Sequence, residues 1–226
     1  MRKILLLFLF TLCFGLSIQL KAQLENGATA SNWTATDING QTWTLYNILN
    51  QNKPVIIDFS ATWCGPCWNY HNSGVLEELY NEFGPNGSDD IMVFFIEADL
   101  STNTACLYGP NGCVGGTQGN WVNGTPYPII DLNSTTAYIE ANYQINYYPT
   151  LYAISPDKRA WEVGQAGAAT WENWMFSSFT LAVEGDAYNA VCPGGGGVNL
   201  NVTGGYLNKS YEWSNGSTAQ DLTGVD

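Results

Sequence analysis

The sequence has few basic side chains and a single histidine. Its 226 residues contain 7 Lys and Arg against 20 Asp and Glu, which gives a formal net charge of −13. Nucleic-acid binding is not expected, because phosphate backbones are held mainly by Lys and Arg. The same shortage of cations argues against docking on an anionic membrane surface. What the sequence does have is 45% hydrophobic residues, too many for a disordered chain, and six cysteines.

The first residues are typical of a secretory signal peptide. Arg2 and Lys3 precede a mainly apolar run, and Ala22 supplies a small residue near its end. We expect residues 1–23 to be removed, which leaves a net charge of about −16 and a protein without membrane insertion. A membrane-spanning anchor is the alternative, although the apolar run is borderline in length. The expected location is the periplasm, the cell surface or the medium.

Removal of the leader also removes one of the six cysteines. An odd number then remains in a compartment where disulfides persist; these five are Cys64, Cys67, Cys106, Cys113 and Cys192.

The pattern after the leader predicts an α/β domain over residues 24–188. Residues 54–60 and 91–98 are short, continuous apolar runs, as in strands buried on both faces. The apolar positions between them predict a helix over 66–83, so a parallel strand pair with a helical crossover is expected. Further elements are expected as a strand at 127–132, a helix at 134–143 capped by Ser134, a hairpin of strands 150–154 and 160–163, and a helix at 170–184.

Two segments do not fit this α/β pattern. Residues 100–127 form a long connection rich in Gly and Asn, and such loops are usually functional or held by a disulfide. Residues 189–226 change to β-type alternation, with strands expected at 198–203 and 211–213. So short a segment cannot bury a core by itself, and we expect it to be the start of a truncated β-sandwich repeat.

The motif that carries chemistry is the run Trp63-Cys64-Gly65-Pro66-Cys67. It follows a buried strand and opens a helix, where unpaired N–H groups favour a thiolate on Cys64. Pro66 is tolerated there, because the first helical turn does not need its N–H. Cys67 lies one turn further on and could attack a mixed disulfide on Cys64.

Two other interpretations of the motif remain open. One is a purely structural disulfide. The other is a metal site, for example for copper, that uses Cys64, Cys67 and His71 at successive turns of one helix. A zinc site needs four ligands and neither a second Cys-x-x-Cys nor another histidine is present, so we expect no metal and no cofactor. His71 itself is expected to be a partly exposed helix residue.

The run from Val55 to Cys67 closely resembles the active-site region of thioredoxins. Tyr147-Tyr148-Pro149-Thr150 is similar to the cis-proline loop of that family. The spacing of Tyr127-Pro128-Ile129-Ile130-Asp131 before this loop resembles the secreted TlpA/ResA-like branch, which carries an inserted segment. The resemblance covers about residues 35–185. It implies a thioredoxin-like fold, with a central mixed sheet flanked by helices.

The resemblance also implies roles for individual residues. Asp58 matches the buried acid of the family, which takes a proton from the second cysteine. An acid between Ile57 and Phe59 is also hard to explain structurally. Substrate contacts are implied at the motif and at the cis-proline loop, at Trp63, Gly65, Pro66, Tyr148, Pro149 and Thr150.

Three positions depart from the family pattern. Ser60 stands where an aromatic residue is common, and Trp68 stands where a basic residue is common. Strand 93–97 lacks the lysine that thioredoxin places near the buried acid. We therefore expect Asp58 to be harder to ionise, which leaves the reduction potential open.

Outside the motif, Cys106 and Cys113 are expected to close a small loop by a disulfide, with a second redox pair as the alternative. The tail resembles the start of Ig-like repeats in surface adhesins of Bacteroidetes, through residues 201–205 and 211–224.

The sequence therefore predicts an exported thiol-disulfide oxidoreductase that acts on protein thiols and disulfides and requires a redox partner. The alternative functions are a thioredoxin-like binding head on a surface protein, with a structural disulfide, and copper handling.

Overall fold

A computed structural model describes residues 23–176, 181–189, 195–204 and 211–225. Nearly all of the expected signal peptide lies outside the described residues, as does Cys192. Across the described part, we find no helix with the length and apolar character needed to cross a bilayer.

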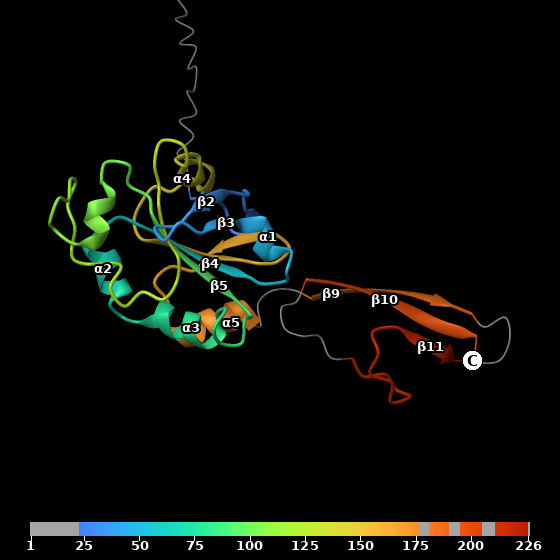
Figure 1. Cartoon of the computed structure of the whole chain (residues 1–226). Coiled ribbons are helices and arrows are strands. Elements are labelled where there is room, and N and C mark those ends of the chain that lie inside the picture. Colours follow the sequence, from blue (N-terminus) through green and yellow to red (C-terminus); the bar gives the residue numbers. More distant parts are fainter. Residues whose placement is uncertain (1–22, 177–180, 190–194, 205–210, 226) are drawn as a thin grey trace, which may run out of the picture.

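The centre of the molecule is a six-stranded mixed sheet in the order β1-β8-β7-β4-β5-β6 (Figure 1). Its strands are β1 Ala28–Thr29, β4 Val55–Ser60, β5 Met92–Glu97, β6 Ile129–Asp131, β7 Thr150–Ile154 and β8 Arg159–Glu162. Strand β5 runs parallel to both β4 and β6, whereas the other pairings are antiparallel. The parallel strands and the β7–β8 hairpin confirm the expected α/β architecture.

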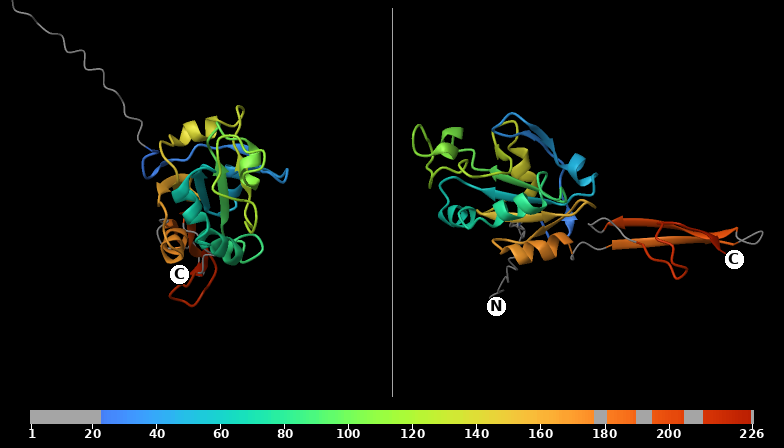
Figure 2. Two further views of the ribbon diagram at one scale, coloured as in Figure 1. Left: turned by 90° about the vertical axis from the view of Figure 1, so that its left-hand side faces the viewer. Right: turned by 60° about the horizontal axis from the view of Figure 1, so that its bottom comes forward.

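Helices and a small hairpin cover this sheet (Figure 2). The helices are α1 Leu45–Leu49, α2 Gly65–His71, α3 Val75–Phe83, α4 Tyr138–Tyr143 and α5 Ala168–Phe176, and the hairpin is β2 Thr34–Thr36 with β3 Thr42–Thr44. Every residue of β4 and β5 is buried, as a sheet covered on both faces requires.

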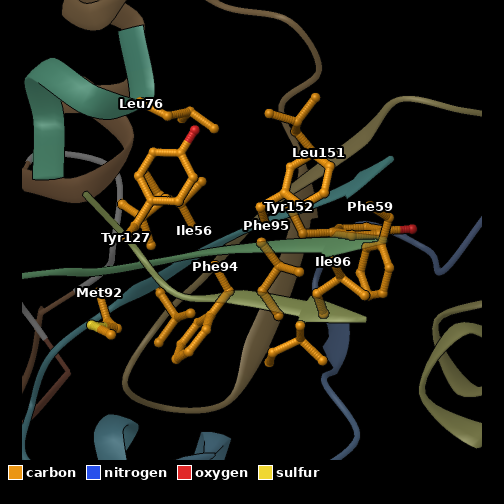
Figure 3. Packing of buried hydrophobic residues seen from close by; sticks show 14 of the residues in the cluster. Ile56, Phe59, Leu76, Met92, Phe94, Phe95, Ile96, Tyr127, Leu151 and Tyr152 are labelled. Carbon is orange, nitrogen blue, oxygen red and sulfur yellow. The ribbon is translucent and has the colours of Figure 1, made fainter. Parts of the chain in front are cut away.

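The core consists of aliphatic and aromatic side chains on both faces of the central strands (Figure 3). The ring of Phe94 makes T-shaped contacts with Trp33 and Trp43, at ring-centroid distances of 5.2 and 5.5 Å. The next residue, Phe95, points to the opposite face and contacts Trp121. Because side chains alternate in this way, each residue of β4 and β5 packs on one or the other face of the sheet.

The helix predictions over 66–83 and 134–143 need correction. The helix expected over 66–83 is divided, because Gly74 has a left-handed φ of 76° and separates α2 from α3. Ser134 is not a helix cap, since α4 begins only at Tyr138. The side chain of Asn133 instead accepts the N–H of Thr135 and holds a turn before the helix.

The long connection between β5 and β6 contains a 3-10 helix, η1 Thr104–Tyr108. A disulfide joins Cys106 to Cys113, with an S–S distance of 2.04 Å. The Asn103 side chain accepts the N–H of Val114 and donates to the carbonyl of Gly112. The connection is therefore tied together internally. We call residues 99–121 the insert.

The C-terminal part forms a separate antiparallel sheet in the order β11-β10-β9, with β9 Leu181–Tyr188, β10 Gly196–Gly204 and β11 Leu222–Val225. The helix expected over 170–184 is wrong at its end, since a strand begins at Leu181. The strand expected at 211–213 is also wrong, because no strand is assigned there. Strand β9 falls inside the range expected for the α/β domain but pairs with β10 of the C-terminal sheet.

Candidate active site

The two cysteines of the motif lie at the start of α2, directly after the central strand β4. They form a disulfide with an S–S distance of 1.99 Å and a Cα–Cα distance of 5.3 Å. Cys64 is the N-cap of α2, and its sulfur accepts the backbone N–H of Cys67 at 3.2 Å. Because this N–H would also stabilise a thiolate, Cys64 is the better placed of the two sulfurs to carry negative charge.

Pro66 occupies the first turn of α2, where a missing N–H leaves no partner unsatisfied. Its carbonyl accepts a hydrogen bond of 2.9 Å from the side chain of Gln165, which follows β8. Gly65 precedes it, and apart from its chain neighbours and the backbone of α2 no atom lies within 4 Å of the position that a Cβ would take there. The motif therefore leaves open space beside the disulfide.

A second loop lies close to this motif. The Tyr148–Pro149 peptide bond is cis, and Thr150 begins strand β7 immediately after it. The Trp63 and Tyr148 rings meet edge to face with centroids 6.2 Å apart. The Thr150 hydroxyl donates to the carbonyl of Tyr147 at 2.8 Å and so holds the loop. The structure thus brings together the two segments expected to bind substrate.

Asp58 lies in the middle of β4 and is almost completely buried. Burial raises the pKa of Asp58 to about 7; a hydrogen bond from Ser60 opposes this shift, and the charge of Glu77 reinforces it. Tyr70 of α2 also interacts electrostatically with Asp58. Asp58 therefore faces the layer of α2 and α3, on the side of the sheet that carries the cysteine helix.

The neighbours of Asp58 include polar side chains that the sequence did not single out. Glu77 accepts a hydrogen bond of 3.2 Å from the hydroxyl of Tyr127, and its pKa is raised by burial. One Glu77 oxygen, Oε2, is buried without a hydrogen-bond partner. The helical spacing of α3 indicated only an amphipathic helix, so nothing marked Glu77 as facing inward.

His71 is buried, which corrects the expectation of a partly exposed residue. Its ring stacks on Trp68 and contacts Trp121, at centroid distances of 5.5 and 5.1 Å. Burial lowers the pKa of His71 to about 4, so it is uncharged at neutral pH. Its Nδ1 lies 3.7 Å from Glu77, too far for a good hydrogen bond, and this contact is not an ion pair at neutral pH.

Glu97 is a second buried acid that the sequence analysis missed. It ends β5 opposite Ser60 and lies on the same face of the sheet as Asp58. Burial raises the pKa of Glu97 to about 8 against hydrogen bonds from Thr102 and the Thr62 backbone. The sequence did contain a signal for this buried acid, because Glu97 is a charged residue at the end of an otherwise apolar strand.

The structure does not favour the copper interpretation. Within the described residues, no three His, Cys, Asp or Glu side chains gather as metal ligands. Cys64 and Cys67 are bonded to each other, and His71 is packed among tryptophan rings, so the three do not converge on one point.

The mixed sheet, the cysteine pair at the start of α2 and the adjacent cis-proline loop define a thioredoxin-like α/β fold. Residues 37–109 match the Thioredoxin family model.

Two curated relatives match shorter stretches of the chain. Thioredoxin of Mycolicibacterium smegmatis is 42% identical over 59 residues, which cover 26% of this chain and 47% of that protein. Thioredoxin M2, chloroplastic, of Arabidopsis thaliana is 34% identical over 79 residues, which cover 34% of this chain and 39% of that protein. The chain thus spans about half the length, or less, of these relatives.

Two solved structures are also similar. The thioredoxin domain of a thiol-disulfide oxidoreductase from Bacteroides vulgatus has a TM-score of 0.47 and 16% identity, covering 66% of this chain and 94% of that one. A thiol-disulfide oxidoreductase from Bacteroides fragilis has a TM-score of 0.47 and 16% identity, with coverages of 64% and 96%.

Proposed function

We propose that this chain is an exported thiol-disulfide oxidoreductase that exchanges disulfides with protein substrates. The observation that carries the proposal is the Cys64–Cys67 disulfide at the start of α2, on the side of the sheet that Asp58 faces. A structural disulfide would need neither a sulfur aligned with a helical N–H nor a buried acid with a pKa near neutrality.

In this proposal, the disulfide form oxidises a substrate dithiol in two steps. A substrate thiolate attacks the Cys64 sulfur, which breaks the Cys64–Cys67 bond and releases Cys67, which takes up a proton. The second substrate thiolate then attacks the substrate sulfur that is bonded to Cys64. This forms the substrate disulfide and releases Cys64. The substrate loses two electrons and two protons, and the protein gains them. Reduction of a substrate disulfide uses the same steps in reverse.

Asp58 is the group we propose to exchange the proton with Cys67. A carboxyl group with a pKa of about 7 can accept or donate a proton near neutral pH with little driving force in either direction. Its burial keeps this proton away from bulk water.

The substrate is proposed to bind across the motif and the cis-proline loop. Trp63 is 44% exposed beside Cys64, and Tyr148 faces it from the neighbouring loop. An extended substrate segment that lies across these two rings could pair with backbone groups around Pro149 and Thr150. Gly65 and Pro66 would lie beneath its reacting sulfur. A further, unidentified redox partner would restore the starting oxidation state.

Export is proposed on the basis of the leader sequence and a structural disulfide. Disulfides such as Cys106–Cys113 persist mainly outside the cytosol, in the periplasm, at the cell surface or in the medium. The three-stranded C-terminal sheet supports the proposal that an Ig-like module, as in surface adhesins, starts after the oxidoreductase domain.

Insulin reduction by dithiothreitol tests the proposed function. The mature protein should accelerate precipitation of the insulin chains, and Cys64→Ser should abolish the acceleration. Cys192→Ser is the matched control, since it removes a cysteine outside the motif and should leave the rate unchanged. A Cys64→Ser variant as active as the wild type would refute the enzyme and favour a binding head with a structural disulfide.

A further inference from the structure

The insert is fastened to the residues that immediately precede Cys64. Gln118 donates its backbone N–H to the carbonyl of Thr62 at 2.9 Å and its side-chain amide to the carbonyl of Trp63 at 2.7 Å. The Thr62 hydroxyl donates to the carbonyl of Gly116 at 2.9 Å. The Trp63 indole N–H donates to Asp99 at 2.6 Å. These four hydrogen bonds fix the insert beside the motif.

The insert is also held in one shape. The Cys106–Cys113 disulfide closes its middle, and the Trp121 N–H donates to the carbonyl of Leu107 at its end. Trp121 is buried against Trp68, with ring centroids 4.9 Å apart. A Cβ at Gly119 would come within 2.5 Å of the Trp68 ring, so the backbone packs directly on α2. A surface fixed in this way can present side chains at defined positions.

The insert surface differs in chemistry from the rest of the chain. Asp99 is the one charged residue of the insert, and no residue from 100 to 130 carries a charged side chain, although the whole chain has 20 acidic and 7 basic ones. Most of the large apolar side chains that are exposed in the described part lie in the insert or in the two loops beside Cys64. They are Trp63, Leu100, Tyr108, Val114 and Tyr147, against Tyr138, Val183 and Tyr188 elsewhere.

We propose that the insert is a substrate-recognition surface, continuous with the motif through Trp63, for an uncharged apolar segment next to the reacting cysteine of a protein substrate. The occupant follows from the surface itself. A strongly acidic protein attracts basic partners over long distances, but between residues 99 and 130 only Asp99 carries a carboxylate, and its two oxygens already accept the Trp63 indole N–H and the backbone N–H of Ser101. Exposed Leu100 and Val114 gain free energy only when apolar groups cover them. This inference rests on the proposed function and specifies its substrate class.

The test compares three disulfide-containing peptides of equal length, with flanks of apolar, Lys or Glu residues, at about 0.15 M salt, where charge attraction beyond about 8 Å is screened. The reduced protein should reduce the apolar peptide with the highest kcat/KM. Val114→Asp and, independently, Leu100→Asp should each lower that value about five- to tenfold. Val183→Asp is the matched control, because Val183 is 53% exposed in β9 and Val114 is 63% exposed.

Reduction of 2-hydroxyethyl disulfide separates the inference from the proposed function. This small substrate needs the cysteines but not the insert, so all three variants should reduce it at the wild-type rate. If the wild type did not reduce 2-hydroxyethyl disulfide, the proposed function would be refuted. Wild-type activity on the small disulfide combined with equal rates on the three peptides, or with equal effects of Val114→Asp and Val183→Asp, would refute the recognition surface alone.

Discussion

The hydroxyl of Ser60 donates a hydrogen bond of 2.6 Å to the carboxyl group of Asp58, two residues earlier on the same face of β4. The bond lowers the pKa of a carboxyl group that burial holds at about 7. Ser60, a departure from the usual aromatic residue, therefore offsets part of the cost of ionising Asp58. The sequence suggested that Asp58 would be hard to ionise but did not reveal this partner.

The first prediction concerns the pH dependence of catalysis. If Asp58 accepts the proton of Cys67, the rate of disulfide reduction should rise as pH increases through about 7. Asp58→Asn should remove this inflection and lower the rate near neutral pH by roughly 10²-fold. At high pH the difference should shrink, because Cys67 then ionises without help. The measurement is a pH profile of single-turnover reduction.

Ser60→Ala provides the control for this profile. Without the hydroxyl, the Asp58 carboxylate loses a donor, so the pKa of Asp58 should rise and the inflection should move to higher pH. An unchanged inflection in both variants would mean that another group controls the pH dependence.

A second prediction concerns stability at alkaline pH. The pKa of Asp58 is raised from 3.8 to about 7 on folding, so the folded state binds this proton more tightly than the unfolded state. The contribution of Asp58 to the free energy of unfolding is therefore fully present below pH 4 and is lost as pH rises toward and through 7. Asp58→Asn should be more stable than the wild type at pH 8, by up to about 4 kcal/mol, and the gain should vanish near pH 4. Denaturant unfolding at both pH values measures it; an equal difference at both would contradict the assignment.

A third prediction concerns acid stability through His71. Its pKa falls from 6.5 to about 4 on folding, so its contribution is present above pH 6.5 and is lost as pH falls through 4. His71→Phe keeps an aromatic ring between the tryptophans but cannot be protonated. Between pH 6.5 and 4, the wild type should lose up to about 3 kcal/mol relative to this variant. The acids Asp58 and Glu97 titrate in both proteins and cancel in the comparison, so parallel stability curves would exclude a buried, neutral His71.

A fourth prediction separates the two disulfides. Replacement of both Cys106 and Cys113 by serine should lower the free energy of unfolding by about 2–3 kcal/mol, because a short closed loop is released in the unfolded chain. The reduction potential of the Cys64–Cys67 pair should not change. A shift in that potential in the double-serine variant would instead support the second redox pair that the sequence left open.

The spacing of apolar residues predicted those parts of the fold that depend on neighbouring residues in the sequence. The apolar runs of β4 and β5 predicted a parallel pair, and the structure confirms the pairing. The break at Gly74 was not apparent, because the apolar spacing continues on both sides of a residue whose left-handed φ divides the helix. The sequence also could not show that Leu181 begins a strand, since β9 depends on pairing with β10.

In the candidate site, too, features set by a contiguous motif were predicted and features set by long-range contacts were not. The roles expected for Cys64 and Asp58 came from a contiguous motif, and the structure places both on or beside one helix–strand unit. The burial of His71 depends on Trp121, fifty residues away, which packs against it only because the insert folds back. Glu97 meets the Thr62 backbone through a different long-range contact, because the parallel strands β4 and β5 end side by side.

The most direct test of the account is a trapping experiment with the Cys67→Ser variant. Without the second thiol, reduced Cys64 should attack a protein disulfide and remain joined to it, because nothing can release the mixed disulfide. Mass spectrometry after incubation with insulin should find insulin bound through a disulfide at Cys64. The Cys64→Ser variant, which retains Cys67, should trap little or none. Equal trapping by the two variants, or none by either, would contradict the assignment of Cys64 as the attacking sulfur.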